Sequence, residues 1–162
     1  MAAYIWSDLH LGHANIIKYC NRPFATAEEM DKLILKNWRN TVRGNDTIIN
    51  LGDVALSGAY PKERLKNVIT NLPGHKILVL GNHDRKKSIQ YWLDVGFHRV
   101  FEYPIIYNKF YILSHDIVFL NDKMPYKNIH GHIHDKKMDS ASYVNVSVEQ
   151  TDYKPIRIDT LY

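Results

Sequence analysis

The sequence predicts an α/β fold in which two packed mixed β-sheets are flanked by helices. Two observations predict it. In the first 96 residues, short apolar runs alternate with segments of helical periodicity, which is typical of β-α units. After residue 96 the segments become short and rich in β-branched and aromatic residues, which is typical of a β-meander. A four-layer α/β/β/α sandwich accommodates both halves.

Three buried strands are predicted in the first half, because each is a short apolar run bounded by polar residues or glycine. They cover residues 3–7, 47–51 and 76–80.

Three helices are predicted between and after these strands. The first begins at Thr26, because Thr26 and Glu29 have the spacing of a capping box. Its apolar residues recur at helical spacing and are Met30, Leu33, Ile34 and Trp38. The second helix begins at Pro61, where a missing N–H costs nothing. The third covers residues 87–95 and is ended by Gly96.

Seven further short strands are predicted in the second half, at residues 97–101, 104–107, 110–114, 116–120, 128–132, 142–148 and 155–158. The dipeptide Asn108-Lys109 predicts a hairpin turn between two of them. The sequence shows no internal repeat and no linker, so we expect a single domain over residues 1–162.

The composition is that of a globular protein in water, with 45% hydrophobic and 23% charged residues. No apolar run approaches the roughly 20 residues that span a bilayer, and no signal-peptide pattern precedes the first strand. Cys20 is the only cysteine, so no internal disulfide can form. We therefore expect a cytoplasmic protein with no membrane partner. The formal net charge of +4 favours anionic partners such as phosphates.

Polar motifs follow several predicted strands. They are Asp8-Leu9-His10, Gly52-Asp53, Gly81-Asn82-His83-Asp84, an isolated His115, and Gly131-His132-Ile133-His134. Ligands gather outside the carboxyl ends of strands in α/β sheets, so we expect these side chains to converge. Residues i and i+2 of a strand share a face, which would let Asp8 and His10 hold one ion, and His132 and His134 point into the same site. Carboxylate, amide and imidazole ligands suit Mn²⁺, Fe or Zn²⁺ better than Ca²⁺.

This ordered set of motifs resembles that of the calcineurin-like metallophosphoesterase superfamily. The segments Gly12-His13 and Asn21-Arg22-Pro23-Phe24 are similar to those of a small bacterial and phage branch of phosphoesterases. The resemblance implies two adjacent divalent ions, most readily Mn²⁺, with Fe, Zn²⁺ or Ni²⁺ as alternatives. The residues that it implies as ligands are Asp8, His10 and His134 for the first ion, Asn82, His115 and His132 for the second, and Asp53 as the bridge.

The resemblance also implies a mechanism. A hydroxide shared by the ions would attack phosphorus directly, without a covalent enzyme intermediate. His83 would face the scissile phosphate and protonate the departing oxygen, and Asp84 would hold the His83 ring. We therefore expect a phosphoric ester hydrolase that acts on a phosphomonoester or a small phosphodiester, with nucleotide-like compounds among the candidates.

Substrate contacts are expected from residues near the motifs. Arg22 or Arg85 could hold a non-bridging phosphate oxygen, and His13 could approach the substrate. Lys86 and Lys87 fit a solvated helix start better.

Some roles stay open at this point. Asp116 could replace His115 as a ligand, because His115 carries no motif around it. His130 is expected to pack rather than to line the site, and Cys20 to be a small buried hydrophobe. The tyrosines that could stack on a nucleobase, although sheet packing explains them better, are Tyr126, Tyr143 and Tyr153.

Two other functions would fit part of the sequence. A nuclease acting on single-stranded nucleic acid would suit the basic charge and residues 85–87, but the chain is short and has no recognisable DNA-binding motif. A non-catalytic scaffold that binds a partner protein would be expected to have lost ligands or the catalytic histidine, and none is missing. The sequence does not indicate the oligomeric state.

Overall fold

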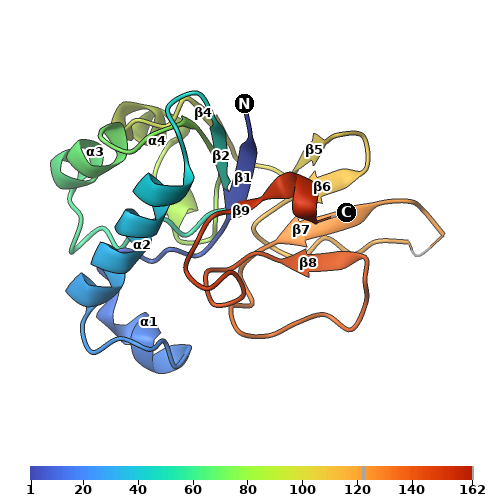
Figure 1. The fold of residues 1–162 in the computed structure, drawn as a ribbon, viewed down its shortest axis with the longest axis horizontal. Coiled ribbons are helices and arrows are strands. Elements are labelled where there is room, and N and C mark those ends of the chain that lie inside the picture. Colours follow the sequence, from blue (N-terminus) through green and yellow to red (C-terminus); the bar gives the residue numbers. More distant parts are fainter. Residues whose placement is uncertain (122, 162) are drawn as a thin grey trace.

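The computed structural model describes residues 1–121 and 123–161. Two mixed β-sheets pack face to face, and the α-helices lie against the outer face of the larger sheet (Figure 1). This arrangement confirms the predicted fold class. The helices are α1 (Ala14–Tyr19), α2 (Ala27–Thr41), α3 (Lys62–Thr70) and α4 (Ile89–Val95), with short 3₁₀ turns η1 (Asp84–Lys86) and η2 (Ile158–Thr160).

The larger sheet has the strand order β4-β3-β2-β1-β9. Its strands are β1 (Ala3–Trp6), β2 (Thr47–Asn50), β3 (His75–Val79), β4 (Arg99–Phe101) and β9 (Ile156–Arg157). The first four run parallel, and β9 is antiparallel to β1. Side chains alternate between faces, so Trp6 packs under the helices while Ile5 faces the other sheet. Parallel pairing brings the carboxyl ends of β1, β2 and β3 to one edge.

The smaller sheet has the strand order β5-β6-β7-β8. Its strands are β5 (Ile105–Tyr107), β6 (Tyr111–Leu113), β7 (Lys127–His130) and β8 (Tyr143–Asn145). Asn108 and Lys109 form the predicted turn of the β5–β6 hairpin, with φ values of 47° and 72°. The predicted meander is wrong, because β6, β7 and β8 are parallel. Their carboxyl ends therefore also meet at one edge.

The predicted strand at 116–120 is also wrong. This extended segment lies over the outer face of the smaller sheet, where Val118 N donates to Asn128 Oδ1 (2.8 Å) and Leu120 N donates to the Tyr143 hydroxyl (3.0 Å). Side chains, not a neighbouring strand, therefore satisfy its amides. No α-helix of the described residues covers this face, so the extended segment takes the place of the expected fourth layer (Figure 1).

Helix boundaries follow local capping. Thr26 Oγ1 accepts from Glu29 N (3.1 Å), which confirms the predicted start of α2. The helix predicted at 87–95 begins two residues later, because Ser88 Oγ caps it by accepting from Tyr91 N (3.1 Å). Before that cap, η1 turns the chain at the edge where the polar motifs lie.

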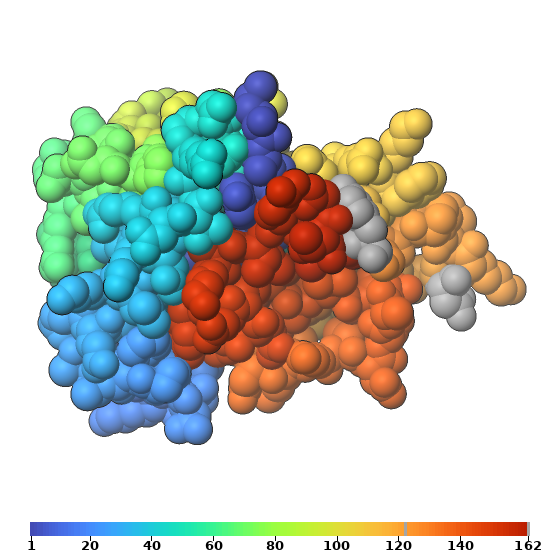
Figure 2. All heavy atoms as spheres, in the orientation of Figure 1, coloured from blue at the N-terminus to red at the C-terminus, as the bar shows by residue number. Residues whose placement is uncertain are grey.

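Two apolar clusters hold the layers together. One lies between the helices and the larger sheet, where Trp6 and Trp38 pack edge to face with ring centroids 5.5 Å apart. The second lies between the sheets and includes Ile5, Leu113 and Ile129. The C-terminal residues, red in Figure 2, pack against both the helical layer and the smaller sheet. No helix in the described part of the chain is long and apolar enough to cross a bilayer.

Candidate metal centre and active site

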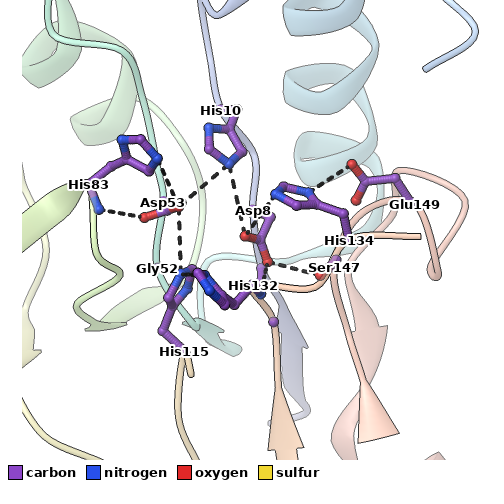
Figure 3. Close-up of polar contacts among 12 residues, drawn as sticks. Asp8, His10, Gly52, Asp53, His83, His115, His132, His134, Ser147 and Glu149 are labelled. Carbon is purple, nitrogen blue, oxygen red and sulfur yellow. Dashed lines mark hydrogen bonds and ion pairs between the residues drawn. The ribbon is translucent and has the colours of Figure 1, made fainter. Parts of the chain in front are cut away.

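Parallel strands from both sheets supply the residues that the sequence predicts as ligands. Each lies two or three residues past the end of β1, β2, β3, β6 or β7, and these are Asp8, Asp53, Asn82, His115 and His132. The carboxyl ends of the strands meet where the two sheets adjoin, so the side chains converge (Figure 3). His10 and His134 follow on the same loops.

The backbone at the site departs from strand geometry. Asp8, His10, Asp53, His132 and His134 all have left-handed φ angles, between 50° and 71°. The predicted strand alternation within the motifs is therefore wrong, because β1 and β7 end before the motifs begin. A left-handed non-glycine residue costs on the order of 1–3 kcal/mol, and such strain clusters at functional sites. These turns also send His132 and His134 into two different clusters.

The first cluster consists of Asp8, His10 and His134. His10 Nε2 and His134 Nε2 lie 3.9 Å and 3.8 Å from Asp8 Oδ1. Two atoms that are each about 2.1 Å from one ion lie roughly 3.0–4.2 Å apart, so the spacing fits a shared cation. Asp8 Oδ2 accepts from His132 N and Ser147 Oγ, both at 2.9 Å.

Two buried atoms of this cluster support the fit. Asp8 Oδ1 and His10 Nε2 have no hydrogen-bond partner among the described residues. Burying such groups without a partner costs about 1–3 kcal/mol each. A cation between them would satisfy both, so the donor set fits a divalent ion of the kind that the sequence predicts.

The second cluster surrounds His115. Its Nδ1 lies 2.7 Å from the Leu51 carbonyl, which can only accept, so Nδ1 carries the proton and Nε2 the lone pair. That Nε2 faces Asn82 Oδ1 at 2.9 Å and His132 Nδ1 at 3.1 Å. The lone pairs of His115 Nε2 and Asn82 Oδ1 thus face one another, as those of two ligands of one metal ion do. Asp116 Oδ1 lies 3.9 Å from His132 Nδ1, so it is a further candidate beside His115, not a replacement.

Asp53 lies between the clusters. Its Oδ2 is 3.5 Å from His10 Nε2 and 3.5 Å from His115 Nε2, one nitrogen of each cluster. Burial raises the pKa of Asp53 to about 7, His115 opposes this, and the charges of Asp84 and Asp8 add to it. Cations on both sides would reverse this shift. Asp53 therefore occupies the position that a shared ligand needs (Figure 3).

Two glycines allow the loops to approach this closely. A Cβ at Gly131 would lie 2.2 Å from Asp8 Oδ2, and one at Gly81 would lie 2.2 Å from Asp53 Oδ1. Any larger residue at either position would displace a carboxylate of the site.

Asp84 does not hold the His83 ring, which corrects the expected role. Its buried carboxylate accepts from the backbone N–H groups of Asp53 (2.7 Å), Gly81 (2.9 Å) and Val54 (3.2 Å). It therefore ties the loop of Asp53 to the loop of Asn82. The His83 side chain is 47% exposed, and its Nε2 lies 3.9 Å from Asp53 Oδ2.

The candidate substrate contacts differ in position. Arg22 is only 3% exposed, and its guanidinium donates to the carbonyl oxygens of Asp8 (2.8 Å) and Leu9 (3.1 Å), so the expectation that it meets substrate is corrected. Arg85 forms an ion pair of 3.0 Å with Asp116 at the surface. His13 Nδ1 lies 3.3 Å from His10 Nδ1, beside the cavity next to the metal centre.

Glu149 is a site residue that sequence reasoning missed. Its Oε1 lies 3.0 Å from His134 Nδ1 and accepts from Arg22 Nε (2.8 Å) and Nη2 (2.7 Å). Burial opposes its charged form, but His134 and Arg22 outweigh it and lower the pKa of Glu149. No motif marks Glu149; the one available signal was an acidic residue beyond a predicted strand.

Replacing Glu149 by alanine is expected to weaken metal binding about 10- to 100-fold, because His134 loses the partner that orients its ring. Calorimetric titration with Mn²⁺ would show the loss at one of the two ions. Glu149→Gln keeps an acceptor for His134 and should lie between alanine and wild type. The exposed Glu63→Ala serves as the control. Wild-type affinity in Glu149→Ala would contradict this role.

Three residues that the sequence predicts to pack in the interior, His130, Cys20 and Tyr153, are buried or partly buried. His130 is fully buried, with Nδ1 2.8 Å from the Gly131 carbonyl. Cys20 packs partly buried against the helical cluster, where burial raises its pKa to about 11. Tyr153 packs edge to face on Phe24, with ring centroids 4.9 Å apart. The loop at 120–126 includes residue 122, which lies outside the described residues.

Known proteins resemble this chain over lengths that range from about half of it to nearly all of it. A family model described as calcineurin-like phosphoesterase matches residues 1–158. An uncharacterized protein of Methanocaldococcus jannaschii is 36% identical, over 98% of this chain and 88% of that protein. A gene 66 protein of Mycobacterium phage L5 is 36% identical over 48% of this chain and 37% of its own length. The crystal structure of a protein of unknown function from Aquifex aeolicus superposes with a TM-score of 0.74 at 28% identity, covering 99% of both chains.

Proposed function

The chain belongs to the calcineurin-like phosphoesterase family, and from that membership we propose that it hydrolyses a phosphomonoester or a small phosphodiester at two divalent ions. Family membership makes it a metal-dependent phosphoesterase; the pair of ions and the small substrate are our proposal. One observation carries it: Asp53 Oδ2 lies 3.5 Å from a nitrogen of each cluster. A single-ion site would not need a carboxylate between two sets of lone pairs.

The donor set supports Mn²⁺ as the first choice, with Fe, Zn²⁺ and Ni²⁺ as alternatives. Its ligand atoms are carboxylate oxygens, one amide oxygen and imidazole nitrogens. By the family pattern, Asp8, His10 and His134 would hold the first ion, Asn82, His115 and His132 would hold the second, and Asp53 would contribute to both.

The chain's own residues then have distinct tasks. When bound, the ions would supply a water acidified for attack on phosphorus, and positive charge against the phosphoryl oxygens. Asp8 and Asp53 are held rigidly by hydrogen bonds to their second oxygens, from Ser147 Oγ and His83 N respectively. Such fixed ligands position charge before substrate arrives.

His83 is placed to donate a proton. Burial and the nearby Lys86 lower its pKa, which makes its protonated ring a stronger acid. Because the ring is half-exposed at the rim, it can reach the departing oxygen as the P–O bond breaks. The imidazolium proton would go to that oxygen, which leaves a neutral His83 ring that is then reprotonated from solvent.

Removing the metal is the direct test. Protein stripped with chelator should hydrolyse neither p-nitrophenyl phosphate nor bis-p-nitrophenyl phosphate, and adding Mn²⁺ should restore at least one of these activities. Metal content is measured on the same samples. The relative rates on the two esters separate monoesterase from diesterase activity. Hydrolysis by metal-free protein, or no hydrolysis with both ions bound, would refute the proposal.

A further inference from the structure

A pocket opens beside the metal centre on the side of His83. Its cavity volume is about 80 Å³, and its floor is apolar, with Leu65 and Trp92 buried beneath it. The lining comes from the loop after Asp53, from α3 and from the η1–α4 segment. The polar residues that line it beyond the metal ligands include His13, Ser57, His83, Lys86 and Lys87.

The charge of this pocket is positive. Arg85, Lys86 and Lys87 are consecutive, and Arg85 forms its ion pair with Asp116. Lys86 and Lys87 line the pocket, and neither forms an ion pair within the described part of the chain. Asp53, which faces the metal clusters, is the acidic residue of the lining. Two ammonium groups are therefore left to attract an anion.

The surroundings of Tyr91 show the difference between a paired and an available lysine. Lys62 Nζ and Lys87 Nζ both lie 5.5 Å from the centre of the Tyr91 ring. The ammonium of Lys62 is neutralised by Asp94 at 2.8 Å, and that pair lies outside the pocket lining. Lys87 has no such partner among the described residues and lies on the pocket side.

The position of the pocket indicates which part of a substrate would bind in it. His83 and Asp53 both line the pocket, with His83 Nε2 3.9 Å from Asp53 Oδ2, and the departing oxygen must lie next to His83 if His83 protonates it. Whatever is attached to that oxygen extends away from the ions, into the pocket. The pocket is therefore placed for the leaving group and not for the phosphoryl group.

The volume limits the size of that group. An enclosed cavity of about 150 Å³ binds benzene, and this one has about 80 Å³. A nucleobase is larger than benzene, whereas a carboxylate or a second phosphate is smaller. The apolar floor would desolvate a lysine-bound anion and strengthen the attraction.

We propose that this pocket is a subsite for a second anionic group, which Lys86 and Lys87 bind. The inference rests on the proposed function and narrows it: the substrate is a small phosphate ester whose leaving group carries a negative charge of its own. Lys86 and Lys87 would then determine substrate specificity. From the sequence alone, they were expected to be only the solvated start of a helix.

Two probes of nearly equal shape test this. 3-Phosphoglycerate carries a carboxylate where glycerol 3-phosphate carries a neutral hydroxymethyl group, far from the scissile bond. With Mn²⁺ bound, we expect kcat/KM, or the inhibition constant against bis-p-nitrophenyl phosphate if neither is hydrolysed, to favour 3-phosphoglycerate about tenfold, or about 1.4 kcal/mol. The double variant Lys86→Gln/Lys87→Gln should remove the preference, so that the two probes give the same value in this variant.

Bound metal ions also attract the carboxylate of 3-phosphoglycerate, so the preference of the wild type alone does not test the lysines. The comparison of variants does. The charge-matched control Lys32→Gln/Lys36→Gln, at two exposed positions of α2, should keep the full preference. A preference that is absent in wild type, or that survives in Lys86→Gln/Lys87→Gln, would overturn the subsite. Calorimetric binding of both probes needs no turnover. It therefore separates a failed subsite, where the probes bind alike, from a failed function, where they differ in affinity but no ester is hydrolysed.

Discussion

Replacing Asp53 by alanine is expected to release both metal ions and to lower hydrolysis to background. Asp53 Oδ2 is the atom that faces both clusters, so its loss removes a ligand from each ion at once. Removing any other predicted ligand takes a donor from one cluster. Metal analysis of the purified variant, with kcat on a p-nitrophenyl ester, measures both effects. Asp53→Ala protein that retains two tightly bound ions would show that the bridge is assigned wrongly.

A separate experiment must show that Asp53 variants fold. The raised pKa of Asp53 predicts how the melting temperature of such a variant changes with pH. Without metal, its folded pKa of about 7 lies above the ordinary 3.8. Between these values the folded state binds more protons than the unfolded state, so stability falls as pH rises. Asp53→Asn cannot ionise. Its metal-free form should therefore melt at a higher temperature than metal-free wild type at pH 8, and at a similar temperature near pH 4.

The residue types of the motifs allowed the convergence of most candidate ligands to be predicted, because the chemistry of a metal centre restricts these types strongly. Asp8, Asp53 and Asn82 were expected to converge without knowing which strands pair, since residues at the carboxyl ends of strands meet wherever those strands are parallel. His115 was included because of the family resemblance alone. The local shape of the chain was also predictable where it depends on capping, as at Thr26.

Strand order in the second half was not predictable from periodicity. The alternation of side chains is the same in parallel and antiparallel strands, so short strands at 110–114 and 128–132 suggested a meander. The contacts that set the strand order join residues distant in the chain. For example, the side-chain amide of Asn128 donates to the Ile112 carbonyl and to Ser114 Oγ. Those bonds belong to the tertiary structure and leave no local signal.

The supporting residues escaped prediction for the same reason. Asp84 is near His83 in sequence, yet its carboxylate satisfies three backbone amides of two loops. Glu149 lies 15 residues from His134 and 127 from Arg22, and only the fold brings them together. A metal ligand can be inferred from its type, but the group that orients the ligand can come from any segment.

Replacing His83 by alanine is expected to have a different effect from any ligand variant: both ions stay, and kcat falls about 10²- to 10⁴-fold. His83 belongs to neither ligand cluster, and its Nε2 lies 3.9 Å from Asp53 Oδ2. Its backbone N–H, which supports Asp53 Oδ1 at 3.0 Å, remains in the variant. Metal analysis and steady-state kinetics measure the two effects separately.

The most specific test of His83 as a proton donor compares leaving groups that differ in their need for a proton. p-Nitrophenolate departs without a proton, whereas an alkoxide needs one, so His83→Ala should lose far more activity on an alkyl phosphate than on a p-nitrophenyl ester. His13→Ala is a useful comparison, because His13 lines the same pocket but contacts His10 and not Asp53. Equal losses of His83→Ala on both esters would assign His83 to charge stabilisation at the phosphoryl group. An empty metal site would make it a ligand instead.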